Sequence, residues 1–158
     1  MERVDPRVAA VRSARFAELS TATLYGVLRL RAEVFVVEQQ CVYLDLDGRD
    51  TDPTTTHWWI EGDGGDVLAY LRLLRVPSSD DVSGRKAGSA IGRVVTAGGL
   101  RNRGLGSRLL TAALRVAPRP VRIDAQSRLV PWYATFGFVT TGDEFLEDGI
   151  AHVPLQRS

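Results

Sequence analysis

Apolar positions in this chain alternate between short β-branched runs and longer stretches with helical spacing. Ile91–Val95 is a short β-branched run, which is typical of a buried strand. From Gly104 onward, apolar residues recur at helical spacing, which predicts an amphipathic helix with one apolar face. The residues of this face are Leu105, Leu109, Leu110, Ala113 and Leu114. This part of the chain is therefore predicted to be a strand, a glycine-containing turn and a helix, in that order.

The same reasoning predicts the remaining elements. Further strands are expected at Ala14–Glu18, His57–Glu61, Val67–Val76, Val121–Ala125, Gly137–Thr141 and near His152–Leu155. Helices are expected from Ala22 to about Val37, with Thr21 as the N-terminal cap, and over Leu129–Phe136. The polar stretches Cys41–Thr55 and Pro77–Gly88 are expected to be loops. This alternation predicts a mixed α/β sheet with helices on its faces.

Two arginines interrupt the apolar strands. Arg72 lies in Val67–Val76, which is otherwise apolar on both faces apart from Tyr70 and is therefore expected at the centre of the sheet. Arg93 lies in Ile91–Val95. A buried guanidinium needs a partner, and the candidate carboxylates are Glu38, Asp47, Asp50 and Asp52. Either these groups line an acceptor pocket or they form ion pairs with a structural role only, and the sequence leaves both interpretations open.

The composition is that of one domain. With 158 residues, 44% of them apolar, residues 1–158 are expected to share a single core, with residues 1–11 as a flexible N-terminal extension. The formal net charge of +1 provides no field for nucleic acid or an anionic membrane. No apolar run of about 18 residues occurs, and Met1–Asp5 lacks the apolar core of a signal peptide. The single Cys41 cannot form an internal disulfide, so the protein is predicted to be cytoplasmic.

The turn between the central strand and helix carries the most specific chemistry. It reads Arg101-Asn102-Arg103-Gly104-Leu105-Gly106, an R-x-x-G-x-G pattern. The first turn of a helix has unpaired N–H donors and a partial positive charge, and glycines let a ligand oxygen approach them closely. The two arginines add charged donors at the edge. The turn therefore predicts a pyrophosphate site, although it is neither a Walker A loop nor a complete G-x-G-x-x-G loop.

These residues resemble the GCN5-related N-acetyltransferase (GNAT) superfamily. In that superfamily an R-x-x-G-x-G turn after a strand is followed later by a block like Tyr133-Ala-Thr-Phe-Gly137-Phe138. Three further blocks resemble its small bacterial ElaA-like branch: Val34-Phe-Val-Val-Glu38-Gln39, Ile91-Gly-Arg-Val-Val and Glu147-Asp-Gly-Ile-Ala-His152. The resemblance extends from about Leu24 to His152. It implies a mixed, mostly antiparallel sheet of about six to seven strands with helices on both faces.

The resemblance also implies acetyl-coenzyme A (acetyl-CoA) as the acyl donor. The pyrophosphate is expected on the turn, and the pantetheine amides are expected to pair with the edge of Gly92–Thr96, where a bulge exposes backbone N–H and C=O groups. One such N–H would also polarise the thioester carbonyl. The alternative is that this strand only packs in the core. The residues expected to bind the cofactor are Val94, Val95, Thr96, Arg101, Asn102, Arg103, Gly104, Leu105, Gly106 and Ser107.

By the same resemblance, Tyr133 donates a proton to the departing thiolate; a core aromatic is the alternative interpretation. Proton transfer from a phenol with a pKa of ~10 to a thiolate whose thiol has a pKa of ~8.5 is uphill by only about 2 kcal/mol.

The attacking amine must lose a proton before it can react. Deprotonating an alkylammonium ion of pKa ~10.4 at pH 7 costs about 4.6 kcal/mol, so a general base is expected.

The candidate bases are Glu38, Asp47, Asp50, His57 and His152. Glu38 and His152 lie in the ElaA-like blocks and are the two expected to act, with a structural role as the alternative for each. His57 is expected to be structural. No pair of histidines has metal-ligand spacing, so no metal site is expected.

The sequence therefore predicts an N-acetyltransferase that moves an acetyl group from acetyl-CoA to a primary amine by direct attack in a ternary complex. The alternatives are a non-catalytic acyl-CoA-binding sensor or interaction module, and an acyltransferase that resembles acyl-homoserine-lactone synthases. The acceptor is expected to be a small-molecule or peptide amine, with no nucleic-acid or membrane partner. The acceptor's identity, the general base, the acyl-chain preference and the oligomeric state, with a homodimer among the alternatives, stay open.

Overall fold

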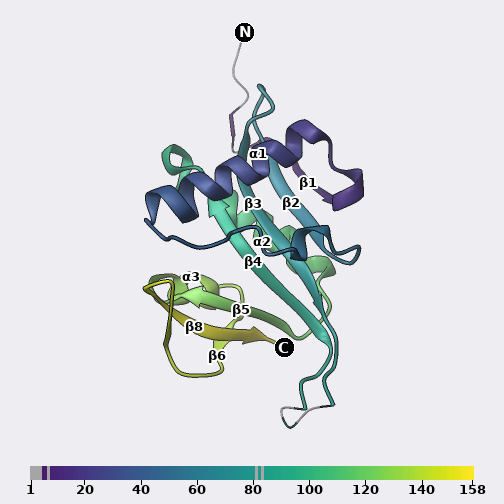
Figure 1. Cartoon of the computed structure of the whole chain (residues 1–158), viewed down its shortest axis with the longest axis vertical. Coiled ribbons are helices and arrows are strands. Elements are labelled where there is room, and N and C mark those ends of the chain that lie inside the picture. Colours follow the sequence, from purple (N-terminus) through teal and green to yellow (C-terminus); the bar gives the residue numbers. More distant parts are fainter. Residues whose placement is uncertain (1–4, 7, 81, 83) are drawn as a thin grey trace.

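The computed structural model describes every residue of the chain except 1–4, 7, 81 and 83. Its centre is an eight-stranded sheet in the order β1-β2-β3-β4-β5-β8-β6, with β7 paired to β8 (Figure 1). All neighbouring strands are antiparallel except β4 and β5, which are parallel. The strands are β1 (Val11–Arg15), β2 (Thr56–Glu61), β3 (Val67–Val76), β4 (Gly88–Thr96), β5 (Val121–Gln126), β6 (Val139–Thr140), β7 (Phe145–Glu147) and β8 (Ile150–Arg157).

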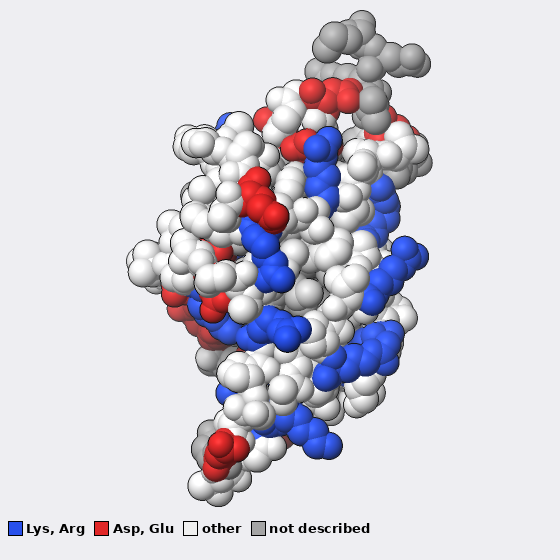
Figure 2. Space-filling model, turned by 90° about the vertical axis from the view of Figure 1, so that its right-hand side faces the viewer, with Lys and Arg blue, Asp and Glu red and all other residues white. Residues whose placement is uncertain are grey.

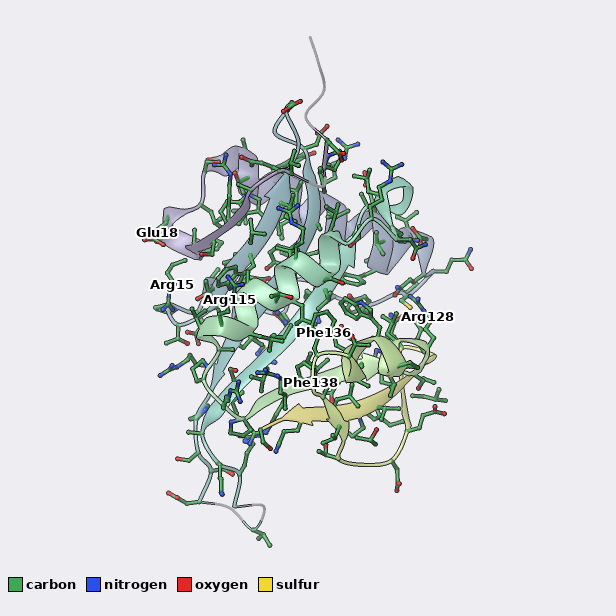
Figure 3. All side chains as sticks on the ribbon, turned by 180° about the vertical axis from the view of Figure 1, so that it is seen from behind. Arg15, Glu18, Arg115, Arg128, Phe136 and Phe138 are labelled. Atoms are coloured by element: carbon green, nitrogen blue, oxygen red, sulfur yellow. The ribbon has the colours of Figure 1, made fainter. Side chains whose placement is uncertain are left out.

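Helices cover both faces of this sheet. Helix α1 (Thr21–Arg31) crosses one face in Figure 1, and α2 (Leu105–Val116) crosses the other face, which Figure 3 shows from behind. The short α3 (Val130–Ala134) lies beside β5. The mixed, mostly antiparallel sheet with helices on both faces is therefore confirmed, and the short strand β7 brings the total to eight, one above the expected number.

The apolar face of α2 explains why this helix packs where it does. Its five predicted stripe residues are all buried, together with Ile91 of β4 and Val121 and Ile123 of β5. Each fully buried aliphatic side chain of this kind contributes roughly 1.5–3 kcal/mol to folding. A second, smaller cluster holds α1 against the opposite face through residues such as Val27, Leu30 and Tyr70. The sheet is thus fixed between two apolar layers.

The N-terminal elements differ from the prediction in their boundaries. The first strand begins at Val11 rather than Ala14, because Val11–Arg15 pairs along β2 and the chain then turns at Phe16–Glu18. Ser20, not Thr21, caps α1: its hydroxyl accepts a hydrogen bond from the backbone N–H of Thr23. The α-helix ends at Arg31, and Ala32–Glu38 continues as a π-helical segment. In the expected extension, residues 1–4 and 7 lie outside the described residues, while Arg108 of α2 donates hydrogen bonds to the carbonyls of Pro6 and Ala9.

The C-terminal elements are shorter than predicted, and one was missed. The helix expected over Leu129–Phe136 is the shorter α3, and the strand expected over Gly137–Thr141 is reduced to β6. Strand β7 was not predicted because all three of its residues are exposed, so no apolar pattern marks it; its pairing with β8 defines it instead. The last strand, β8, extends on both sides of the predicted His152–Leu155.

The sheet divides between β4 and β5. These two strands pair only at Ser89–Val121 and Ala90–Arg122, and beyond these pairs they part (Figure 1). On its other side β4 pairs with β3 almost to its end, but the register shifts between Tyr70 and Arg72, and Arg93 has a φ of 54°. This is the geometry of a β-bulge, in which two residues of one strand face one residue of the other. The bulge in β4 that the resemblance implied is therefore present.

The surface carries charges of both signs. Figure 2 shows one side of the molecule, where basic side chains are scattered among neutral ones and acidic side chains lie beside them. This distribution accompanies the formal net charge of +1. None of the helices in the described part of the chain combines the length and the apolar character that crossing a membrane requires.

Candidate active site

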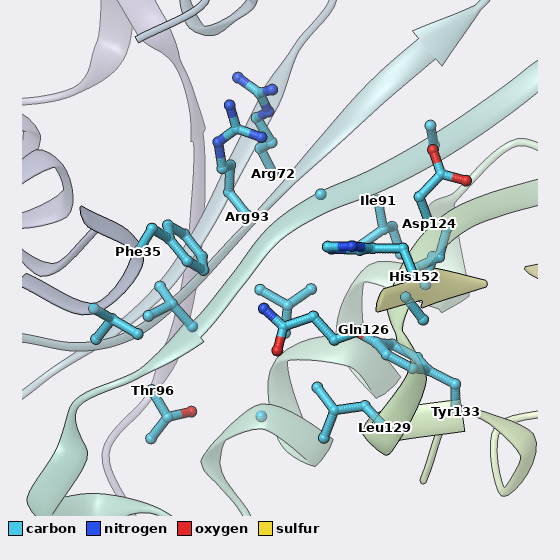
Figure 4. Close-up of a pocket in the computed structure, with 18 of the residues that line it drawn as sticks. Phe35, Arg72, Ile91, Arg93, Thr96, Asp124, Gln126, Leu129, Tyr133 and His152 are labelled. Atoms are coloured by element: carbon cyan, nitrogen blue, oxygen red, sulfur yellow. The ribbon is translucent and has the colours of Figure 1, made fainter. Parts of the chain in front are cut away.

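A large cavity opens where β4 and β5 part. Its volume is about 1090 Å³, at the upper end of the range typical of ligand sites. The bulged half of β4, the turn before α2, α3 and the facing ends of β5 and β8 line it, and Figure 4 shows side chains from these elements pointing into it. Residues distant in the sequence therefore meet around one space.

The turn before α2 forms one wall of the cavity. Asn102 and Gly104 have φ angles of 62° and 79°, and Gly104 is the N-cap of α2, so the chain enters the helix through a left-handed turn. This leaves the first-turn N–H groups of α2 unpaired by the helix itself, which is the arrangement that binds phosphate oxygens. Of the predicted turn residues, Arg101, Asn102, Gly104, Leu105, Gly106 and Ser107 line the cavity, and Arg103 does not.

The predicted strand residues Val94, Val95 and Thr96 line the same cavity. They follow the bulge, and their edge is not paired with β5, since that pairing ends at Ala90. Along an extended strand, backbone N–H and C=O groups point alternately to the two sides. This edge therefore presents donors and acceptors that a ligand with amide groups can pair with as if it were a strand.

Tyr133 lies on α3 and lines the cavity. It is only 3% exposed, and its ring contacts Trp132 and Phe138 edge-on. Burial raises the pKa of the Tyr133 phenol well above its usual value. The hydroxyl therefore stays protonated throughout the neutral range, and complete proton transfer to a thiolate costs more than for an exposed tyrosine. Its most favourable action is to donate a hydrogen bond.

His152 lies on β8, beside the same cavity (Figure 4). Its Nδ1 is 2.8 Å from the carbonyl oxygen of Ile150, and a carbonyl can only accept, so Nδ1 carries the proton. In the neutral imidazole, Nε2 then has a free lone pair; Glu147 Oε2 lies 3.9 Å from it, and Phe145 stacks on the ring. The ring is thus held in the tautomer that a general base needs.

Glu38, the other predicted base, is held differently. It lies at the end of the π-helical segment and forms an ion pair with Arg101, with 2.6 Å between Oε1 and Nη1. The hydrogen bond from Arg101 lowers the pKa of Glu38. A lower pKa makes a carboxylate a weaker proton acceptor, so this contact favours His152 over Glu38 as the base. The pair also fixes Arg101 at the edge of the cavity.

A buried ionic network joins the loop after α1 to the central strands. Three arginines (Arg31, Arg72, Arg93) pair with three aspartates (Asp45, Asp47, Asp50) at distances of 2.5–3.5 Å. The expectation that Arg72 and Arg93 are paired with carboxylates is confirmed, and two of the four candidates, Asp47 and Asp50, are among the partners. Asp52 is exposed and is not in the network, and Glu38 pairs with Arg101 instead. Arg31 and Asp45 were not predicted, because Arg31 belongs to a helical pattern in which polar residues normally face solvent.

Asp50 is central to this network, since its Oδ1 accepts hydrogen bonds from both Arg31 and Arg72. Burial alone would raise the pKa of Asp50, but the hydrogen bond and charge of Arg31, with Arg72, outweigh burial and lower it. A carboxyl with a lowered folded-state pKa stabilises the fold above its unfolded pKa of ~3.9 and loses that contribution as the pH falls.

We expect Asp50→Asn to reduce the free energy of unfolding by about 3 kcal/mol at pH 7, because two buried guanidinium groups lose a charged partner. The loss should shrink below about pH 4, where the Asp50 carboxyl of the unfolded wild-type chain begins to take up a proton. Urea unfolding between pH 3 and 7 measures both effects. Asp52→Asn, at an exposed aspartate, is the control and should cost less than about 1 kcal/mol; equal losses for the two variants would mean that the network is not stabilising.

Two other polar residues have structural contacts. His57, a candidate base, donates through Nε2 to the backbone carbonyl of Asp50. In the neutral ring Nδ1 then accepts a hydrogen bond from the Tyr70 hydroxyl, and burial lowers the pKa of His57. It is fully buried outside the cavity. Cys41 lines the cavity but is nearly buried, with Sγ 3.5 Å from the carbonyls of Gln39 and Asp148. Among the described residues, no three His, Cys, Asp or Glu side chains are grouped so that they could hold a metal ion.

Comparisons of sequence identify related proteins. A family model described as an acetyltransferase (GNAT) domain matches residues 78–158. A UPF0039 protein of Mycobacterium tuberculosis is 46% identical over 149 residues, which make up 94% of this chain and 92% of that protein. Protein ElaA of Escherichia coli is 36% identical over 146 residues, or 89% of this chain and 91% of that protein.

Comparisons of structure agree with these relationships. The crystal structure of an acyl-CoA N-acyltransferase from Pseudomonas aeruginosa is similar with a TM-score of 0.82 and 37% identity, covering 95% of this chain and 99% of that one. The crystal structure of Escherichia coli ElaA is similar with a TM-score of 0.80 and 33% identity, covering 96% and 100%. The chain therefore belongs to the GNAT acyltransferase family, in its ElaA-like branch.

Proposed function

We propose that this protein is an N-acetyltransferase that transfers an acetyl group from acetyl-CoA to a primary amine by direct attack. One observation supports this proposal above all. The parting of β4 from β5 opens a single cavity that is lined by the turn before α2, the free edge of β4, Tyr133 and His152. An acyl-CoA requires a site for its phosphates and a strand edge for its amides, and an attacking amine requires a base. Residues suited to each of these three tasks line this one cavity.

Each residue has a distinct task in the proposed reaction. Backbone N–H groups of the α2 turn bind the pyrophosphate, with Arg101 at the edge of the site. His152 Nε2 accepts the proton of the ammonium group, directly or through water, so that a neutral amine attacks the thioester carbon. An N–H of the β4 edge after the bulge donates to the carbonyl oxygen as negative charge develops on it. As the C–S bond breaks, the attacking nitrogen releases its second proton to solvent, and Tyr133 donates a hydrogen bond and then its proton to the sulfur. The phenolate is then reprotonated from solvent or from the imidazolium.

Direct attack is favoured over a covalent acyl-enzyme. Cys41 is the one cysteine in the sequence, and its thiol is next to two backbone carbonyls rather than beside a base. A thiol is activated as a nucleophile by a nearby cation or base, which these contacts do not provide. The amine and the acyl-CoA are therefore proposed to be bound together.

Two measurements on the whole protein test the proposal. Titration calorimetry with coenzyme A should show binding, and a panel of primary amines with acetyl-CoA should release free thiol. Binding without thiol release for any amine would instead indicate the non-catalytic acyl-CoA-binding module. A strong preference for an acyl-carrier protein over coenzyme A would indicate the lactone-synthase-like alternative. The absence of any heat at millimolar coenzyme A, with folded protein, would contradict both the acetyltransferase and the acyl-CoA-binding module.

The role of His152 predicts a specific loss of activity. Without Nε2, the side chain at this position no longer accepts the proton of the ammonium group. We expect His152→Gln to lower kcat/KM by about a hundredfold at pH 7 while the affinity for coenzyme A changes by less than about threefold. Steady-state rates and titration calorimetry measure the two effects. Glu38→Gln should lower kcat/KM by less than about tenfold; if Glu38→Gln has the larger effect of the two, Glu38 is the base.

A further inference from the structure

Arg72 has one guanidinium nitrogen that the ionic network does not use. Its Nη1 donates to Asp47 and Asp50, and its Nη2 donates to Asp47. Its Nε has no hydrogen-bond partner among the described residues, although the side chain is only 2% exposed and lines the cavity. A buried charged donor without a partner is unfavourable, and an acceptor supplied by a bound ligand would remove this cost.

The space in front of this group is kept open by Gly92. Gly92 lies opposite Arg72 in the β3–β4 pairing and also lines the cavity. A Cβ at Gly92 would lie 3.9 Å from Arg72 Nε and would meet no other heavy atom within 4 Å. Nothing in the backbone conformation requires a glycine here, since its φ is outside the left-handed range. The absence of a side chain therefore leaves room for a ligand atom beside the N–H.

Arg72 and His152 face the same side of the sheet. Their neighbours in sequence, Leu71 and Val153, belong to the core layer under α2, so both of these polar side chains point to the opposite side. Figure 4 shows Arg72 and His152 on opposite sides of β4, and both residues line the cavity. An acceptor held in this shared cavity can therefore have one border at His152 and another at Arg72.

The spacing along β4 suits a small group. Gly92 is two residues before Val94, the first residue after the bulge. Two extended residues span about 6.6 Å, and the left-handed Arg93 between them shortens this span. In an α-amino acid, the nitrogen and the carboxyl or carbonyl oxygen are separated by three bonds, or about 3 Å, and a hydrogen bond adds about 2.9 Å. The sum is compatible with the span from Val94 to Gly92, which lies opposite Arg72.

We propose that the acceptor is an amine with a carbonyl or carboxylate oxygen three bonds from its nitrogen, as in a free α-amino acid or a peptide N-terminus, and that this oxygen accepts a hydrogen bond from Arg72 Nε. This inference rests on the proposed amine acetylation and deepens it. An alkylamine such as a lysine side chain has methylene groups at this position and would offer the Arg72 N–H no acceptor. Sites built to hydrogen-bond a substrate group strongly reject analogues that lack it.

Three acceptors of nearly equal size test the proposal: alanine, alaninamide and isopropylamine, in which a methyl group replaces the carboxylate. For each, kcat/KM is measured by thiol release with wild-type protein and with Gly92→Ala, whose Cβ would occupy the space beside Arg72 Nε. We expect Gly92→Ala to lower kcat/KM about tenfold or more for the oxygen-bearing acceptors and less than about twofold for isopropylamine. Since each amine's own pKa is the same for both proteins, this comparison isolates the contact with Arg72.

The arms of this experiment distinguish the two sources of the oxygen. A preference for alanine indicates free amino acids, and a preference for alaninamide indicates peptide N-termini. Gly64→Ala, at an exposed glycine in the turn between β2 and β3 with an ordinary φ, is the matched control and should leave all rates unchanged. Equal losses for all three acceptors with Gly92→Ala, or no loss for any of them, would overturn the proposal.

A binding measurement keeps the inference separate from the proposed activity. With coenzyme A present, N-acetylalanine or its amide should bind wild-type protein at least about tenfold more tightly than N-isopropylacetamide, and Gly92→Ala should remove this difference. Thiol release from isopropylamine as efficient as from the other acceptors, without this binding difference, leaves the acetyltransferase in place and overturns the role of Arg72. If the binding difference is clear but no acceptor is turned over, the role of Arg72 stands and the proposed acetyltransferase activity is contradicted.

Discussion

Replacing Gly104 with valine is expected to weaken acyl-CoA binding by at least about a hundredfold. Gly104 has a φ of 79°, and a Cβ there would meet no protein atom within 4 Å, because the position faces the open cavity. A β-branched side chain would stand in front of the N–H groups at the start of α2. Losing two hydrogen bonds to a charged phosphate costs about 3–6 kcal/mol, and 1.4 kcal/mol corresponds to tenfold in affinity. Titration calorimetry with coenzyme A measures the change.

Gly65→Val separates the loss of the site from backbone strain. Gly65 has the same φ of 79° and equally open surroundings, but it lies in the turn between β2 and β3, away from the cavity. Both variants should lose similar unfolding free energy, about 1–2 kcal/mol, because a left-handed valine is strained. Only Gly104→Val should lose affinity. Wild-type affinity in Gly104→Val would show that the turn before α2 does not hold the pyrophosphate.

Removing the hydroxyl of Tyr133 is expected to lower kcat by about a hundredfold while the affinity for coenzyme A changes by less than about threefold. In Tyr133→Phe the ring keeps its edge-on contacts with Trp132 and Phe138, so the walls of the cavity keep their shape. The departing sulfur then loses its hydrogen-bond donor and must leave as a free thiolate. Because burial raises the pKa of the phenol, the wild-type donor is protonated at every pH where the assay is practical.

Tyr25→Phe is the matched control, since Tyr25 is exposed on α1 and outside the cavity. It should keep wild-type kcat and affinity. A lower kcat with unchanged affinity would indicate a catalytic role of Tyr133. A purely structural role would instead lower kcat, affinity and thermal stability together. If Tyr133→Phe turns over at the wild-type rate, another group or solvent protonates the sulfur.

Elements with a strong local pattern were predicted well. Strand β3 has the predicted bounds, Val67–Val76, because a run that is apolar on both faces has few alternatives to the centre of a sheet. The five leucine and alanine residues of the α2 stripe are buried as predicted. Most of the predicted cofactor-binding residues line one cavity, because the turn and the strand that carry them are close in sequence and joined by a short connection.

The contacts around the site required distant segments to meet. The ionic network pairs residues 14 to 48 positions apart, so neither Arg31 nor Asp45 stood out in its local context. Glu38 pairs with Arg101 across 63 positions, which changes its suitability as a base. The proton position on His152 depends on the carbonyl of Ile150, and the sequence shows the histidine but not the direction in which it donates.

The sequence by itself determined the type of sheet, the helix that covers it, and the glycine turn at the N-terminus of that helix, because periodicity and turn chemistry act within a few residues. The tertiary structure alone decided where β4 and β5 part, which carboxylates neutralise the buried arginines, and which nitrogen of Arg72 has no hydrogen-bond partner among the described residues. These features depend on the register between strands and on the packing of distant segments, and such non-local contacts leave no pattern in any single stretch of the chain.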